Sequence, residues 1–229
     1  MQPFQITTPA SASGLSASQN RVLRNTYAML GLTMVPTVIG ALIGVSTNFS
    51  LPGGPLLSFV LFMAIAFGFF WGINKTKNSP MGVALLLGFT FFMGLLLSGI
   101  LRVALGFGNG GTLIALAAGG TGAIFFTLST IAATTKRNFT NMGKFLFIGI
   151  VVLLLAMLAN IFLQLPALSL TISAVAVMLF SAWILYDISR IVHGGETNYI
   201  MATLSVYLNL FNLFVHLLQL LMVFAGERD

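Results

Sequence analysis

Seven long apolar stretches alternate with short polar segments along the chain. Each is close to the roughly 20 residues that a helix needs to cross a hydrocarbon core of about 30 Å. In lipid, a helix satisfies its backbone hydrogen-bonding groups within the segment itself. The pattern therefore predicts an all-α integral membrane protein, a bundle of seven transmembrane helices, over residues 27–47, 56–73, 81–101, 112–134, 145–163, 168–191 and 199–225.

The composition agrees with burial in a membrane and excludes several classes of protein. Hydrophobic residues make up 58% of the chain, charged residues only 6%, and the mean hydropathy is +1.02. A water-soluble surface needs more charge than this. The net charge of +6 does not indicate a nucleic-acid partner, because the cations lie in short loops beside apolar spans. The absence of cysteine excludes disulfides and thiolate metal sites.

Positively charged residues are concentrated on one side of the predicted spans. Loops rich in Lys and Arg stay in the cytoplasm. The bias therefore predicts a cytoplasmic N-terminus and a C-terminus outside. Of the ten Lys and Arg residues, eight lie on the predicted cytoplasmic side, namely Arg21, Arg24, Lys75, Lys77, Lys136, Arg137, Lys144 and Arg190.

The first 20 residues differ in composition from the rest of the chain. Residues 1–20 are rich in Ser, Ala, Thr and Gln and carry no charged side chain. They lack the basic segment and short apolar stretch of a cleavable signal peptide. Because such a composition buries too little apolar surface to fold, we expect a mobile cytoplasmic tail. A single seven-helix transmembrane domain over residues 21–229 follows it.

Small residues recur four positions apart within the predicted spans. Such spacing lets helix backbones approach closely. It is consistent with packing inside one chain and with dimerisation. The pairs are Gly40 with Gly44, Gly68 with Gly72, Ala115 with Gly119, and Ala118 with Gly122.

Asp187 is the only acidic side chain within a predicted span. A carboxylate inside the membrane is expensive and usually serves an ion pathway or a switch. The alternative is a simple pair with Arg190, three residues later on the same helix face. We take both residues as candidates for an ion pathway or a proton sensor.

Polar side chains form a second candidate feature in the last predicted span. At helical spacing they share one stripe, which must face protein or water. The stripe is either a polar contact between helices or the lining of a solvated cavity. Its histidine either titrates near neutral pH or is a hydrogen-bonded packing residue. The stripe consists of Ser205, Asn209, Asn212, His216 and Gln219, of which Asn209, Asn212 and His216 join the candidates.

Enzyme signatures are missing from the sequence. We find none of the motifs HExxH, GxSxG or GxxxxGK, and no pair of intramembrane carboxylates suited to aspartyl proteolysis. Gly108, Gly110 and Gly111 follow no predicted strand, so we assign them no cofactor role. We expect a protein that is not an enzyme and holds no cofactor.

Three strings carry a resemblance to a known family. Residues 22–27 read VLRNTY, residues 160–168 read NIFLQLPAL, and residues 193–200 read HGGETNYI. From about residue 20 to its end, the chain resembles the bacterial YccA-like branch of the Bax inhibitor-1 family, of which GGETNY is typical. The resemblance implies a seven-helix bundle around a central helix in the bacterial inner membrane.

The resemblance also implies two functions. Members of this branch bind and modulate the membrane AAA protease FtsH with its associated proteins HflK and HflC. Other bacterial members are pH-sensitive calcium leak channels, in which two aspartates on the last two helices share protons. These positions correspond here to Asp187 and Asn209. Because asparagine cannot ionise, the shared-proton pair is missing, and we favour the protease modulator over the channel.

A secondary transporter fits less well, since we see no repeat of broken helices with paired polar centres.

Overall fold

The computed structural model describes residues 16–135 and 137–226, and these residues fold almost entirely into helices. Seven of the helices are long and apolar enough to cross a membrane, which confirms the predicted number of spans. The elements are α1 (Ala17–Ser46), α2 (Gly54–Thr76), α3 (Pro80–Leu105), α4 (Gly110–Thr134), the 3-10 turn η1 (Phe139–Met142), α5 (Gly143–Leu163), α6 (Pro166–Val192) and α7 (Tyr199–Gly226).

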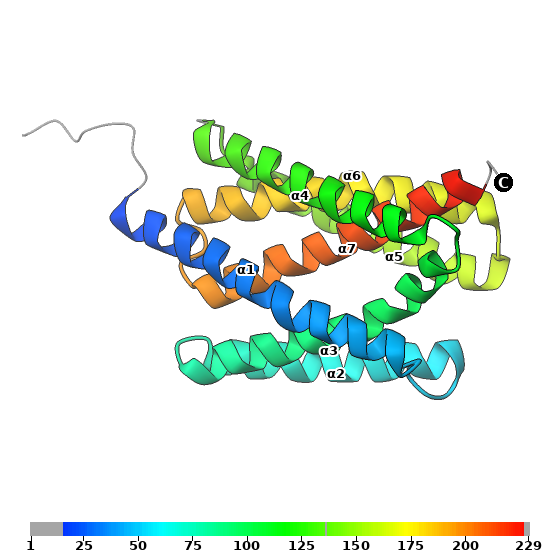
Figure 1. Cartoon of the computed structure of the whole chain (residues 1–229). Coiled ribbons are helices and arrows are strands. Elements are labelled where there is room, and N and C mark those ends of the chain that lie inside the picture. The colour runs from blue at the N-terminus through cyan, green and yellow to red at the C-terminus, as the bar shows by residue number, and fades with distance from the viewer. Residues whose placement is uncertain (1–15, 136, 227–229) are drawn as a thin grey trace, which may run out of the picture.

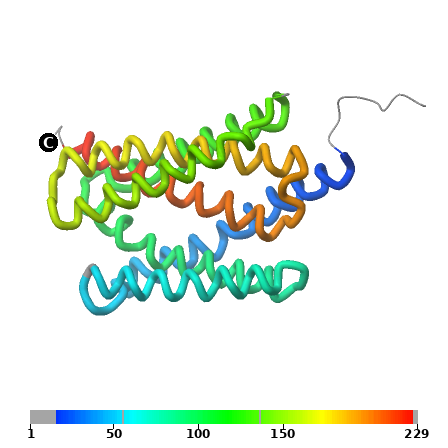
Figure 2. The backbone as a smooth tube through the Cα atoms, turned by 180° about the vertical axis from the view of Figure 1, so that it is seen from behind, coloured from blue at the N-terminus to red at the C-terminus, as the bar shows by residue number. Residues whose placement is uncertain are grey.

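Helix α7 runs through the middle of the bundle (Figure 1). It contacts α1, α2 and α3 on one side and α4 and α6 on the other. The view from behind shows the same arrangement (Figure 2). Helix α5 packs on α6 and leaves most of its surface open, with Phe162 85% exposed. Such an apolar surface needs lipid around it, because water would make its exposure costly. The described chain is therefore one bundle with a central helix.

The start of α1 differs from the prediction. Its first residue, Ala17, lies ten residues before the predicted span and inside the segment expected to be a tail. The reason is a capping box, in which the Ser16 hydroxyl accepts from the Gln19 amide and the Gln19 side chain accepts from the Ser16 amide. Two otherwise unpaired backbone donors are satisfied, so the helix continues into polar sequence. Residues 1–15 of the predicted tail lie outside the described residues.

Helices α1 and α3 approach to backbone contact. A Cβ atom at Gly40 would overlap the carbonyl oxygen of Phe91, and one at Gly94 would overlap that of Thr37. A Cβ at Gly44 would overlap the side chain of Ser98 and approach the Leu95 carbonyl oxygen. The Gly40 and Gly44 pair thus packs within the chain, as one of the two interpretations predicted.

The remaining small pairs behave differently. A Cβ at Gly68, Gly119 or Gly122 would meet no other atom within 4 Å in the described chain. Among the glycines of these pairs, only Gly72 has a neighbour within that distance, the side chain of Leu85 at 3.1 Å. Packing inside the chain therefore does not account for these three glycines, and dimerisation through them stays a prediction.

A buried hydrogen-bond cluster joins the central helix to α1 and α3. The hydroxyl oxygens of Thr37 and Tyr207 lie 2.8 Å apart, and both hydroxyls approach the Thr90 carbonyl oxygen, at 3.2 and 3.4 Å. Tyr207 is only 1% exposed. Polar groups inside a membrane bundle must find such partners, so this cluster fixes α7 against the α1–α3 pair.

Candidate functional site

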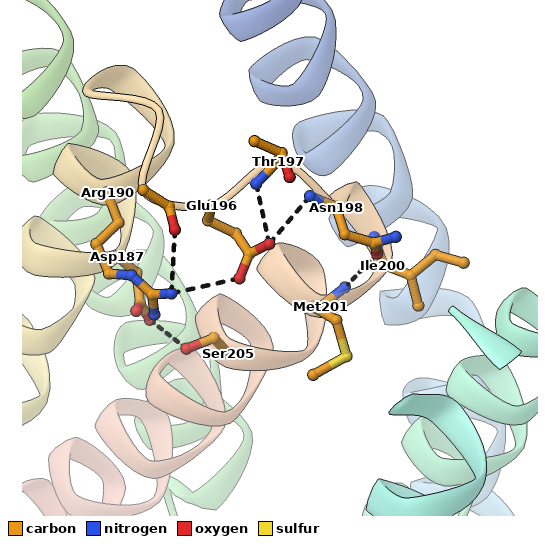
Figure 3. Close-up of polar contacts among 9 residues, drawn as sticks. Asp187, Arg190, Glu196, Thr197, Asn198, Ile200, Met201 and Ser205 are labelled. Atoms are coloured by element: carbon orange, nitrogen blue, oxygen red, sulfur yellow. Dashed lines mark hydrogen bonds and ion pairs between the residues drawn. The ribbon is translucent and has the colours of Figure 1, made fainter. Parts of the chain in front are cut away.

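Asp187 is buried at the contact between α6 and α7, with 4% of its surface exposed. Two side chains of α7 donate hydrogen bonds to its Oδ2 atom. The Ser205 hydroxyl lies at 2.7 Å and the Asn209 amide nitrogen also at 2.7 Å. Figure 3 shows Ser205 pointing across from α7 to the carboxylate. Asp187 and Asn209, which the resemblance placed at the two sensor positions, are therefore in direct contact.

The alternative interpretation expected an ion pair between Arg190 and Asp187, but the ion pair of Arg190 is with another residue. Within the described residues, its Nη2 atom lies 3.4 Å from Oε2 of Glu196 (Figure 3). The same nitrogen donates to the carbonyl oxygen of Gly195 at 3.5 Å. The chain folds back after α6 and brings Glu196 to Arg190, which leaves neutral donors as the direct partners of Asp187.

The polar stripe of α7 faces α6 along most of its length. Beyond Ser205 and Asn209, the His216 ring nitrogen Nδ1 lies 2.9 Å from Gln219 Oε1. Ser173 of α6 donates its hydroxyl to the same oxygen at 2.9 Å. Asn212 bonds instead to the Leu208 carbonyl of its own helix. The prediction of a polar contact between helices is thus confirmed for Ser205, Asn209 and Gln219, whereas the hydrogen bonds of Asn212 and His216 stay within α7.

The far end of the stripe also borders a cleft. His216, Gln219 and Ser173 line a space of about 470 Å³ near the ends of α3 and α5 and the start of α6. The His216 ring stacks on Phe180, with ring centres 6.0 Å apart. Because its Nδ1 faces an amide oxygen, which only accepts, that nitrogen carries the proton. His216 is therefore both a hydrogen-bonded packing residue and part of a cleft wall.

The loop that carries GGETNY joins the end of α6 to the start of α7 and also contacts the α2–α3 loop. Gly194 takes a φ of +75°, a conformation that favours glycine, and turns the chain back after α6. The Glu196 carboxylate then accepts from the amides of Thr197 and Asn198, both at 3.0 Å (Figure 3).

Asn198 is the connecting residue of this loop. Its side-chain oxygen caps α7 by accepting from the amides of Ile200 and Met201, at 3.0 and 3.1 Å. Its side-chain nitrogen donates to the Lys77 carbonyl oxygen at 2.9 Å and to the Asn78 side chain at 2.8 Å. The motif therefore holds the α2–α3 loop against the α6–α7 loop.

The structure adds residues that sequence reasoning missed. Glu196 pairs with the candidate Arg190, and Ser173 bonds to Gln219, the partner of His216. Asn198 caps α7, the helix that carries three of the candidates. Asn198 directly precedes α7, so its preference for helix N-caps was a usable signal. No comparable signal marks Ser173. In the part of the chain that the structure describes, no group of three or more His, Asp or Glu side chains is arranged to hold a metal ion.

Comparison with known proteins identifies the family of this chain. The family model described as "Inhibitor of apoptosis-promoting Bax1" matches residues 19–226. The "Modulator of FtsH protease YccA" of Escherichia coli K12 is 45% identical over 204 residues, which cover 89% of this chain and 90% of the relative. A protein from another E. coli strain, also 45% identical to this chain over 204 residues, is named "Inner membrane protein YccA". An uncharacterised membrane protein of Vibrio cholerae is 39% identical over 93% of this chain and 94% of its own length. The chain thus belongs to the Bax inhibitor-1 family and is similar to YccA.

Proposed function

We propose that this inner-membrane protein is not an enzyme but binds the membrane AAA protease FtsH, with its associated proteins HflK and HflC, and limits its activity. The observation that carries the proposal is the 45% identity, over nearly the whole of both chains, to a protein named as a modulator of FtsH. The seven-helix bundle is consistent with a partner that meets the protease inside the membrane.

The geometry around Asp187 favours this function over an ion channel. The carboxylate accepts two hydrogen bonds from neutral side chains and faces an asparagine amide where the channel mechanism needs a second aspartate. An amide donates to a carboxylate without exchanging its own proton. The pair therefore acts as a fixed link between α6 and α7, and no shared proton is available to open it.

One end of the bundle supplies a surface for the protease. The GGETNY loop meets the α2–α3 loop through Asn198, and Gly194 lies beside the Gln19 side chain at the start of α1. Most Lys and Arg residues belong to this end. We assign it to the cytoplasm, the compartment that keeps positively charged loops, and hence to the side where the chain's tail can meet an AAA protease.

A calcium flux assay separates the proposal from the channel alternative. Calcium-loaded vesicles that contain the purified protein should release no more calcium than calcium-loaded vesicles without it, between about pH 6 and 8. In membranes that contain FtsH, HflK and HflC, the same tagged protein should co-purify with the protease. Partner-free calcium release without co-purification would support the channel instead.

The charge bias gives a prediction for the topology. With seven spans and a cytoplasmic N-terminus, the C-terminus lies outside the cytoplasm. Alkaline phosphatase fused after residue 229 should therefore be active in cells. A reporter that fluoresces only in the cytoplasm should stay dark at the same site. Fluorescence there would mean that the proposed orientation is reversed.

The N-terminal segment gives a second prediction. We propose that residues 1–15 serve as an unfolded handle for the protease, because their composition opposes folding. Deleting residues 2–14 keeps Ser16 and the capping box of α1. The deletion should lengthen the lifetime of the protein in cells several-fold without changing its thermal unfolding temperature. An unchanged decay rate in protease-competent cells would exclude the handle.

A further inference from the structure

A second cleft lies apart from Asp187 and from the cleft beside His216. It has a volume of about 610 Å³ and lies where α2 ends and where α3 and α7 begin. Its walls come from residues 77–80 and Val83 on one side and from residues 197–199 on the other. The bond from Asn198 to the Lys77 carbonyl joins these walls. Two loops far apart in the sequence thus border one open cleft.

The side chains that line this cleft favour an anion. The lining residues include Lys77, whose side chain ends in an ammonium group, and Thr197 and Tyr199, whose side chains carry hydroxyls. Among the described residues, Lys77 has no acidic partner, since the one ion pair found there joins Arg190 to Glu196. Glu196 is not among the lining residues, and its carboxylate accepts hydrogen bonds from Arg190 and from the amides of Thr197 and Asn198. The lining therefore has a cation and hydroxyl donors but no carboxylate, which is the chemistry that binds a phosphate group.

The position of the cleft distinguishes a lipid from a soluble anion. Pro80 and Val83 extend the lining from the loop onto the first turn of α3, a membrane-spanning helix. On α2, Trp71 is 69% exposed one to two turns before Lys77, and such aromatic residues lie at the headgroup level of a membrane. A phosphate at Lys77 would thus lie at headgroup depth, with Val83 beside the glycerol and the first carbons of an acyl chain.

We propose that this cleft binds the phosphate headgroup of an anionic phospholipid from the adjoining leaflet. Lys77 pairs with the phosphate, and the hydroxyls of Thr197 and Tyr199 donate to its oxygens. Basic pockets between transmembrane helices are suited to such headgroups. The bound lipid would bridge the α2–α3 loop and the GGETNY loop, and so stabilise the contact that Asn198 makes.

Lys75 provides a matched control for Lys77. It belongs to the same helix end, but it is exposed, and its Nζ atom lies 4.9 Å from the centre of the Trp71 ring, outside the cleft lining. The full-length protein in neutral detergent would be titrated with phosphatidylglycerol, and bound lipid would be counted by native mass spectrometry. Lys77→Gln should weaken binding roughly tenfold, because a charge-assisted hydrogen bond is lost. Lys75→Gln should leave it unchanged, and Lys77→Arg should retain it.

Further arms test the site and the source of the phosphate. Thr197→Val keeps the shape of the side chain and removes only its hydroxyl, and it should also weaken lipid binding. This variant tests the site even if the Lys77 variants prove unstable. Phosphatidylcholine should bind less than phosphatidylglycerol, because its choline group cancels the negative charge. Equal losses in Lys75→Gln and Lys77→Gln would overturn the proposal in favour of diffuse attraction. Inorganic phosphate that displaces the lipid at equal concentration would overturn it in favour of a soluble anion.

Discussion

Replacing Gly94 with leucine is expected to lower the free energy of unfolding by about 3 kcal/mol or more. A Cβ at this position would already overlap the Thr37 carbonyl oxygen and approach the Ala41 amide at 3.0 Å. Both belong to the backbone of α1, so no side-chain rotation can make room. The two helices would have to separate, and the Thr37 to Tyr207 hydrogen bond would be lost with them. Thermal unfolding in detergent would measure the effect.

Gly99 provides the control on the same helix. A Cβ there would meet no atom within 4 Å. Gly99→Leu should therefore change stability by less than about 1 kcal/mol, the scale of helix propensity alone. Similar losses for the two variants would show that the α1–α3 approach does not depend on Gly94.

The second large effect is expected from Asn209→Asp. The native amide donates to Asp187 at 2.7 Å, so the variant would place two carboxyl groups in contact inside the bundle. Two such groups cannot both ionise easily, and they would share one proton. As the pH rises from about 6 to about 8, loss of that proton should leave two charges in repulsion and make the variant less stable or leaky to calcium. The native chain should show a flatter profile over the same range.

The exchanged double variant, Asp187→Asn with Asn209→Asp, controls for burial and for shape. It keeps one carboxylate and one amide in contact, so its profile should be as flat as that of the native protein. Thermal unfolding and calcium flux in vesicles would report both variants across the pH range. If the native protein already responds to pH as steeply as Asn209→Asp, a second aspartate is not what confers pH sensing, and His216 becomes the residue to test.

The membrane-spanning helices could be predicted because lipid imposes a length and a composition on each of them. Most of the predicted spans end within about three residues of the observed helices. The α3 helix ends four residues after its predicted end, and the largest difference is in α1, which begins ten residues before its predicted start, in polar sequence. Hydropathy does not detect such an extension, because its first turn is stabilised by the Ser16 and Gln19 capping box, and only a few of its residues, such as Val22 and Leu23, pack on the core.

The partners of the candidate residues could not be predicted from spacing along one helix. The interval of three residues between Asp187 and Arg190 suggested a pair, yet their partners come from α7 and from the loop. Which α7 residues reach Asp187 depends on how the loop between the helices turns. The positive φ of Gly194 and the Asn198 cap are local features of that turn, but they do not by themselves specify which α7 side chains then face Asp187.

A reconstituted degradation assay is the most direct test of the proposal that this protein limits FtsH. FtsH in vesicles would digest a labelled membrane substrate with and without an excess of this protein, at equal total protein and lipid. We predict that the rate of degradation falls several-fold when the protein is present. The reduction should persist with the deletion of residues 2–14, since the bundle itself is proposed to make the contact. An unchanged or faster rate of degradation would contradict the account.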